Sequence, residues 1–70
     1  MAIDVAVQRL EIGDVLLIDV PDEERQVEAT VAAPIDRTDT TVRATLRIAG
    51  RDDCAKEWPI GALVTVVRGP

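Results

Sequence analysis

The chain has 70 residues, a formal net charge of −5, one cysteine, one tryptophan, and no histidine, tyrosine or phenylalanine. A chain of this length forms a single domain, residues 1–70, near the lower size limit for folding without a disulfide or a metal. Its 13 acidic residues against 8 basic ones disfavour nucleic acid and anionic membranes as partners, since both are bound mainly through Lys and Arg.

The cysteine count and the apolar pattern also predict a location. One cysteine cannot form an internal disulfide, which suits a reducing compartment. The sequence has no run of eighteen apolar residues, and its N-terminus lacks the basic-then-apolar pattern of a signal peptide. We therefore expect a soluble, cytoplasmic protein.

In the N-terminal third of the chain, the sequence predicts a strand at residues 14–20 and a further candidate strand within residues 1–11. Residues 1–11 form an extension in which Ile3, Val5 and Val7 alternate with more polar neighbours, a pattern typical of an extra strand. Residues 14–20 are a more continuous apolar run, as expected of a strand buried on much of both faces.

Two further segments alternate strictly between apolar and polar side chains. Residues 26–31 and 41–48 have this period of two, which predicts a pair of strands. The second strand would place Arg43 and Arg47 on its outer face and four apolar side chains on its inner face: Val42, Ala44, Leu46 and Ile48.

The segment between these strands predicts a hairpin. Turn-forming residues fill positions 34–39. A hairpin centred near Arg37 and Thr38 would set Glu28 opposite Arg47, a favourable pair of opposite charges, and two threonines opposite each other.

A competing pattern begins at Pro21. A proline followed by acidic residues is a helix-start signal, so residues 21–33 have a helical alternative. That helix would lack a continuous apolar stripe, and we favour a strand from about Gln26 with the acidic residues in a loop.

The C-terminal part predicts two more strands. Gly50 ends the strand of residues 41–49, residues 54–58 form the next strand, and residues 59–62 interrupt the chain before the Val-rich strand 63–67. Short strands joined by tight turns predict an all-β fold. We expect a small five- or six-stranded SH3-like barrel with a single 3-10 turn before the last strand.

Several motifs resemble a family. The sequences IGDV at residues 12–15, a Val-Arg strand ending in glycine at 42–50, and WPIG at 58–61 before the last strand are similar to short actinobacterial SH3-like proteins of unknown function. The resemblance covers residues 12–68. It implies a fold and no assigned activity, because a shared fold does not determine function.

The segment DCAKEWPIG, residues 53–61, holds the cysteine, the tryptophan and the lysine of the chain. On a strand, Cys54, Lys56 and Trp58 share one face. In the first alternative, Trp58 caps the core while Lys56 reaches water beside it. In the second, this face points outward and Trp58 anchors a partner. We favour the first and leave both open.

No catalytic, cofactor or metal site is expected. The chain has no histidine that could act as a base for Cys54. Asp52, Asp53 and Glu57 lack the spacing of a calcium-binding loop. The sequence therefore predicts a protein that is not an enzyme.

Arg43 and Arg47, with Arg51 as a third candidate, form one basic stripe. As a nucleic-acid site the stripe would need stacking aromatic rings, and Trp58 is the only ring in the sequence. A nucleic-acid- or ribosome-associated small barrel is therefore the alternative function rather than the first.

The first functional hypothesis is a small non-catalytic protein–protein interaction or accessory module with an unidentified protein partner. Trp58 and Lys56, with the apolar Val15 or Leu17, would form the contact patch. The alternating N-terminal strand would let the chain form a homo-oligomer by pairing across an open sheet edge.

Overall fold

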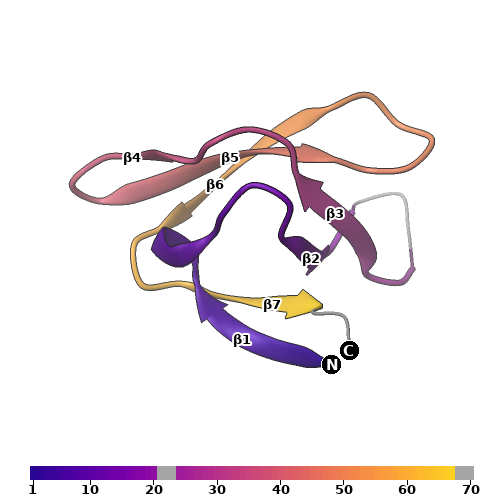
Figure 1. Cartoon of the computed structure of the whole chain (residues 1–70), viewed down its shortest axis with the longest axis horizontal. Helices are drawn as coiled ribbons and strands as arrows, with labels where there is room; N and C mark the ends of the chain where they lie inside the picture. Colours follow the sequence, from indigo (N-terminus) through magenta and orange to yellow (C-terminus); the bar gives the residue numbers. More distant parts are fainter. Residues whose placement is uncertain (21–23, 68–70) are drawn as a thin grey trace.

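The computed structural model describes residues 1–20 and 24–67, which fold into one antiparallel sheet (Figure 1). The strands are β1 (Ala2–Ala6), β2 (Val15–Ile18), β3 (Val27–Val31), β4 (Asp36–Arg37), β5 (Thr41–Arg47), β6 (Cys54–Pro59) and β7 (Leu63–Val67). The prediction of an all-β chain is confirmed. The sheet has seven strands, however, where the sequence predicted five or six.

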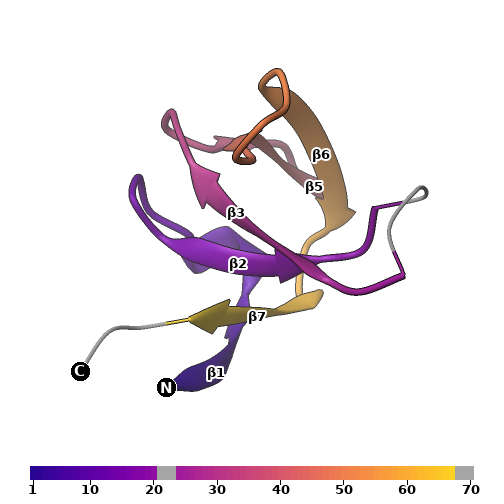
Figure 2. The same cartoon turned by 90° about the vertical axis from the view of Figure 1, so that its right-hand side faces the viewer.

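The sheet folds over itself without closing. The strand order is β1–β7–β2–β3–β5, and β5 also pairs with β4 and β6. β3 pairs with both β2 and β5, so it connects the β5–β6 hairpin to the layer formed by β1, β7 and β2 (Figure 2). Within the described residues, β1 pairs only with β7 and β6 only with β5.

The core lies between the two layers. From β2 and β7 it receives Leu16 and Val66, both with no exposed surface. From β5 and the residue that follows it, the core receives the four side chains that were predicted to point inward: Val42, Ala44, Leu46 and Ile48. Arg43 and Arg47 are exposed on the other face, so the predicted faces of this strand are confirmed.

The N-terminal segment is part of the sheet and of the core. β1 pairs with β7 along its whole length, from Ala2 opposite Val67 to Ala6 opposite Leu63. Val7 does not continue the strand, because the 3-10 helix η1 (Val7–Arg9) begins there. The Val7 side chain is nevertheless fully buried, and its N–H donates to the carbonyl of Ala62 at 2.9 Å.

The break before the last strand differs from the expectation. The 3-10 helix of the described chain lies at Val7–Arg9, not at residues 59–62. There the chain makes a β-turn in which the N–H of Ala62 donates to the carbonyl of Pro59 at 3.1 Å. Gly61 has a φ of 92°, which the third position of a type II turn requires and which favours glycine.

The register between β3 and β5 is shifted by two residues from the predicted one. Thr30 lies opposite Arg47 and Val31 opposite Leu46, whereas the prediction set Glu28 opposite Arg47. An even shift leaves every side chain on its predicted face, so the predicted core residues remain correct.

Two local features cause this shift. The chain advances from Val31 to Asp36 while β5 advances only from Leu46 to Arg43, so the segment 32–35 bulges out of the pairing. The hairpin then turns at residues 39 and 40, because Thr38 Oγ1 accepts the N–H groups of both following threonines at 3.2 and 2.9 Å.

The alternative prediction of a helix at residues 21–33 is wrong for residues 24–33, the part of this segment that the structure describes. Val27–Val31 is strand β3, in agreement with the favoured interpretation. The helix-start signal itself, at residues 21–23, lies outside the described residues.

Candidate binding groove beneath strand β6

The stripe of Cys54, Lys56 and Trp58 faces the core side of the sheet. The three residues lie opposite buried positions of β5, with Lys56 across from Ala44 and Trp58 across from Val42. Trp58 is half-buried and packs against the core cluster. The structure therefore has the first of the two alternatives, in which Trp58 covers the end of the core and Lys56 lies beside it.

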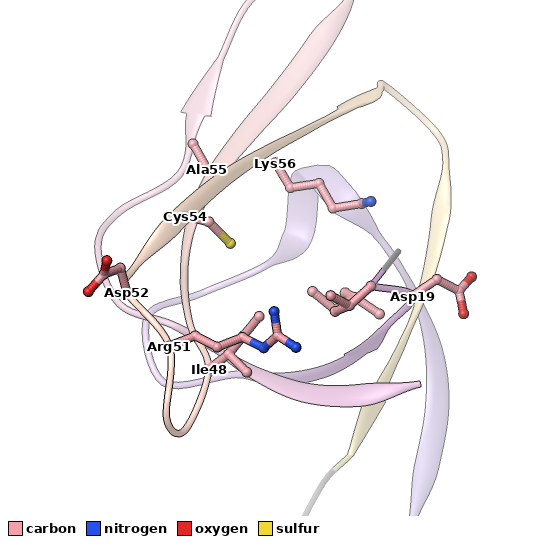
Figure 3. A pocket seen from close by; sticks show the side chains of 9 residues that line it. Asp19, Ile48, Arg51, Asp52, Cys54, Ala55 and Lys56 are labelled. Atoms are coloured by element: carbon pink, nitrogen blue, oxygen red, sulfur yellow. The ribbon is translucent and has the colours of Figure 1, made fainter. Parts of the chain in front are cut away.

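The inner face of β6 is only partly covered. Cys54 is exposed, whereas Leu46, its neighbour on β5, is fully buried. Beneath this end of β6 lies a hollow of about 430 Å³ (Figure 3). Its lining residues are Ile18, Asp19, Val20, Ile48, Arg51, Asp52, Cys54, Ala55 and Lys56.

A second hollow continues along β6 towards its C-terminal end. Its volume is about 330 Å³, and its apolar lining residues include Trp58, Leu17 and Leu63. The two hollows share three lining residues: Ile18, Asp19 and Lys56. We call them together the β6 groove, since both lie along the inner face of one strand.

The charged side chains around the first hollow differ in direction. Figure 3 shows the ammonium of Lys56 and the guanidinium of Arg51 reaching into the hollow, with the thiol of Cys54 between their stems. The carboxylates of Asp19 and Asp52 point away from it. Two cationic groups therefore reach into the first hollow, in a chain whose net charge is −5.

Lys56 is the unusual side chain of this site. It is half-buried, whereas lysines are rarely buried without a partner charge. Within residues 1–20 and 24–67, no salt bridge or hydrogen bond reaches its ammonium. A negatively charged group in the first hollow would lie close to this ammonium and to the guanidinium of Arg51.

Arg43 and Arg47 of the predicted basic stripe lie on the opposite face of the sheet from the groove, whereas Arg51, its third candidate, lines the first hollow. Arg47 donates to Asp53 at 3.2 Å, and this hydrogen bond, together with the charge of Asp53, raises the pKa of Arg47 above its ordinary value. Arg43 lies between Asp36 on β4 and Glu57 on β6. Acidic neighbours thus flank both arginines. The acidic partner of Arg47 is Asp53 rather than the predicted Glu28.

Leu17 and Val15, the two apolar residues predicted to join Trp58 in a contact patch, lie at different places relative to the groove. Leu17 lines the groove with Trp58 and Lys56. Val15 lies further along the outer face of β2, opposite Thr30 and Val67, and does not line the groove.

Sequence reasoning missed Leu63, which is 67% exposed at the mouth of the groove. The alternation of β7 contains the signal, since Leu63 shares the outer face with Thr65.

In the part of the chain that the structure describes, no group of three or more His, Cys, Asp or Glu side chains lies close enough to hold a metal. None of the described helical segments could cross a membrane. The groove offers apolar walls, one ammonium without a partner, and an aromatic ring.

The chain was compared with protein-family models, with curated proteins and with solved structures, and none of the three comparisons gives a match.

Proposed function

We propose that this chain is a small, non-catalytic interaction module that contacts a protein partner through the β6 groove. The observation that supports this most strongly is the combination, around one groove, of a half-buried Trp58, an exposed Leu63 on β7, and a Lys56 that has no partner among the described residues. Tryptophan is enriched at the centres of protein interfaces, and a small chain stabilises itself by covering such residues unless they have another role.

We also propose that the folded-over sheet is an incompletely closed barrel of the SH3-like kind. The pairing of β2 with β3, β3 with β5 and β5 with β6, and the return of β7 onto β2, supports this. A cytoplasmic location remains part of the proposal, because Cys54 is an exposed free thiol.

Self-association through β1 is a further part of the proposal. β1 lies at the end of the strand order, and its half-buried Ile3 and Val5 line a surface hollow of about 750 Å³. An open edge with apolar side chains can pair with the same edge of a second copy.

Nucleic-acid binding gains no support. Arg43 and Arg47 are each flanked by acidic side chains, and the only aromatic ring lies on the other face of the sheet. A protein that binds nucleic acid needs Lys or Arg side chains that are free to neutralise phosphates, because this neutralisation releases the counterions of the nucleic acid.

Photo-crosslinking in the host cell tests the proposed contact. A benzoylphenylalanine replaces either Leu63, at the groove, or Ile12, which is 61% exposed at a distant turn. We expect protein adducts from position 63 and none from position 12. With the crosslinked partner purified, Lys56→Glu is expected to weaken binding at least about tenfold, because it replaces the ammonium by a carboxylate that would repel an acidic group of the partner, at a cost above about 1.4 kcal/mol. Equal adducts at both positions, or none at 63, would contradict the proposal.

A further inference from the structure

Strand β6 has one edge on which the backbone is unpaired. Within residues 1–20 and 24–67, β6 forms its ladder only with β5. In an antiparallel ladder, the backbone groups of alternate residues point to opposite sides of the strand. Every second residue of β6 therefore directs its N–H and C=O away from β5.

The hydrogen bonds beside the strand identify these residues. The N–H of Ile60 donates to the carbonyl of Thr40 at 2.9 Å, so the pairs two and four residues earlier, Trp58 with Val42 and Lys56 with Ala44, are the hydrogen-bonded ones. The backbone groups of Ala55 and Glu57 then face the open edge. No other hydrogen bond of the described backbone reaches them.

This edge borders the groove. Ala55 lines the first hollow, although its side chain belongs to the outer face. A strand laid along the edge would direct every second side chain to the inner face, into the space below β6. Lys56 and Ile18 line both hollows, and a further apolar side chain lies in each, Ile48 in the first and Trp58 in the second. The guanidinium of Arg51 also reaches into the first hollow.

We propose that β6 accepts an extended peptide segment of the partner as an added strand, with an acidic side chain on Lys56 and an apolar side chain on either side of it. The backbone of Ala55 and Glu57 would supply the pairing, and the hollows would receive alternate side chains. The sequence pattern of the segment is apolar–x–acidic–x–apolar. This inference rests on the proposed function and specifies the partner's chemistry.

The charge of the site supports this occupant over a neutral one. An ammonium that is half-buried and unpartnered gains a charge-assisted hydrogen bond from an incoming carboxylate. The outer side chain of Glu57 disfavours acidic residues at the x positions, because like charges opposite each other on neighbouring strands repel. The pattern therefore places the acid on the inner face.

The probe is the peptide acetyl-Ile-Thr-Glu-Thr-Ile-amide, and its control is the same peptide with Gln in place of Glu. Binding is measured in the full chain by ¹⁵N chemical shifts, by Trp58 fluorescence and by the rate of alkylation of Cys54. We expect the Glu peptide to slow the exchange of the Ala55 and Glu57 amide protons and to protect Cys54. We expect the Gln peptide to bind about tenfold more weakly.

Two pairs of variants test separately the contribution of the Lys56 charge and that of the open backbone edge of β6. Lys56→Gln should weaken the Glu peptide about tenfold and leave the Gln peptide unchanged, whereas Arg47→Gln, on the other face, should change neither. Glu57→Pro removes an edge N–H without removing a bond to β5 and should abolish binding. Asp4→Pro makes the same change on the edge of β1 and should leave binding intact.

Three results would overturn the inference. These are no shift in any signal at millimolar peptide, equal affinity of the Glu and Gln peptides, and a Trp58 response without slower exchange at Ala55 and Glu57. If any of them occurs while position 63 still crosslinks a partner, the proposed function stands and only the strand addition is wrong. If binding is lost in Asp4→Pro rather than in Glu57→Pro, the peptide pairs with β1.

Discussion

Leu16→Ala is expected to lower the free energy of unfolding by about 2 to 5 kcal/mol, because Leu16 has no exposed surface and its truncation leaves a cavity. A chain of this length has a total stability of about 4 to 10 kcal/mol. The substitution is therefore expected to leave a large fraction of the protein unfolded. Urea unfolding, followed by circular dichroism and Trp58 fluorescence, measures the change.

Leu63→Ala is the matched control for this substitution. The same chemical change at a side chain that is 67% exposed is expected to cost less than about 0.5 kcal/mol. If Leu16→Ala does not fold at all, Leu16→Met, which nearly conserves volume, is expected to fold with a loss below about 1.5 kcal/mol. Equal losses at positions 16 and 63 would mean that Leu63 is buried in solution, either in the core or in an interface between copies.

Trp58→Ala is expected to cost about 2 kcal/mol, less than a fully buried tryptophan, because the ring covers the core on one side and borders the groove on the other. With no second tryptophan and no tyrosine, the fluorescence of the wild-type chain reports this ring alone. We expect an emission maximum between those of buried and free tryptophan and partial quenching by acrylamide. Quenching as complete as in the unfolded chain, with no loss of stability in Trp58→Ala, would contradict the placement of the ring.

The faces of the strands could be predicted from the sequence because a period of two is a local property. The alternation at residues 41–48 assigned the side chains of β5 to the correct faces, with Val42, Ala44 and Leu46 buried and Arg43 and Arg47 exposed. The same alternation correctly grouped Cys54, Lys56 and Trp58. Both results need only that the segment is extended.

Register and turn type were harder to predict because they depend on single residues. The bulge at 32–35 and the Thr38 turn shift the β3–β5 pairing by two residues, and an even shift leaves no trace in the hydrophobic pattern. The 3-10 helix at Val7–Arg9 was missed for a similar reason, since Val7 is buried as the alternation requires while its backbone leaves the strand.

The groove could be predicted only in part. Its residues on β6 were identified because the segment holds the rare side chains of the chain. Whether their inner face is covered depends on β2 and β7, which are far away in sequence. Leu17 was selected as an apolar outward residue and does line the groove, whereas Val15, selected for the same reason, does not. Their distance from Trp58 is a property of the folded sheet.

The most direct test of the central claim, that β6 is an open strand above a partly covered groove, is amide hydrogen exchange of the chain without a partner. Lys56 and Trp58 should exchange slowly, because their N–H groups bond to β5, and Ala55 and Glu57 should exchange orders of magnitude faster. Slow exchange at all four amides would show that something already covers this edge, and the groove would then not be an available binding site.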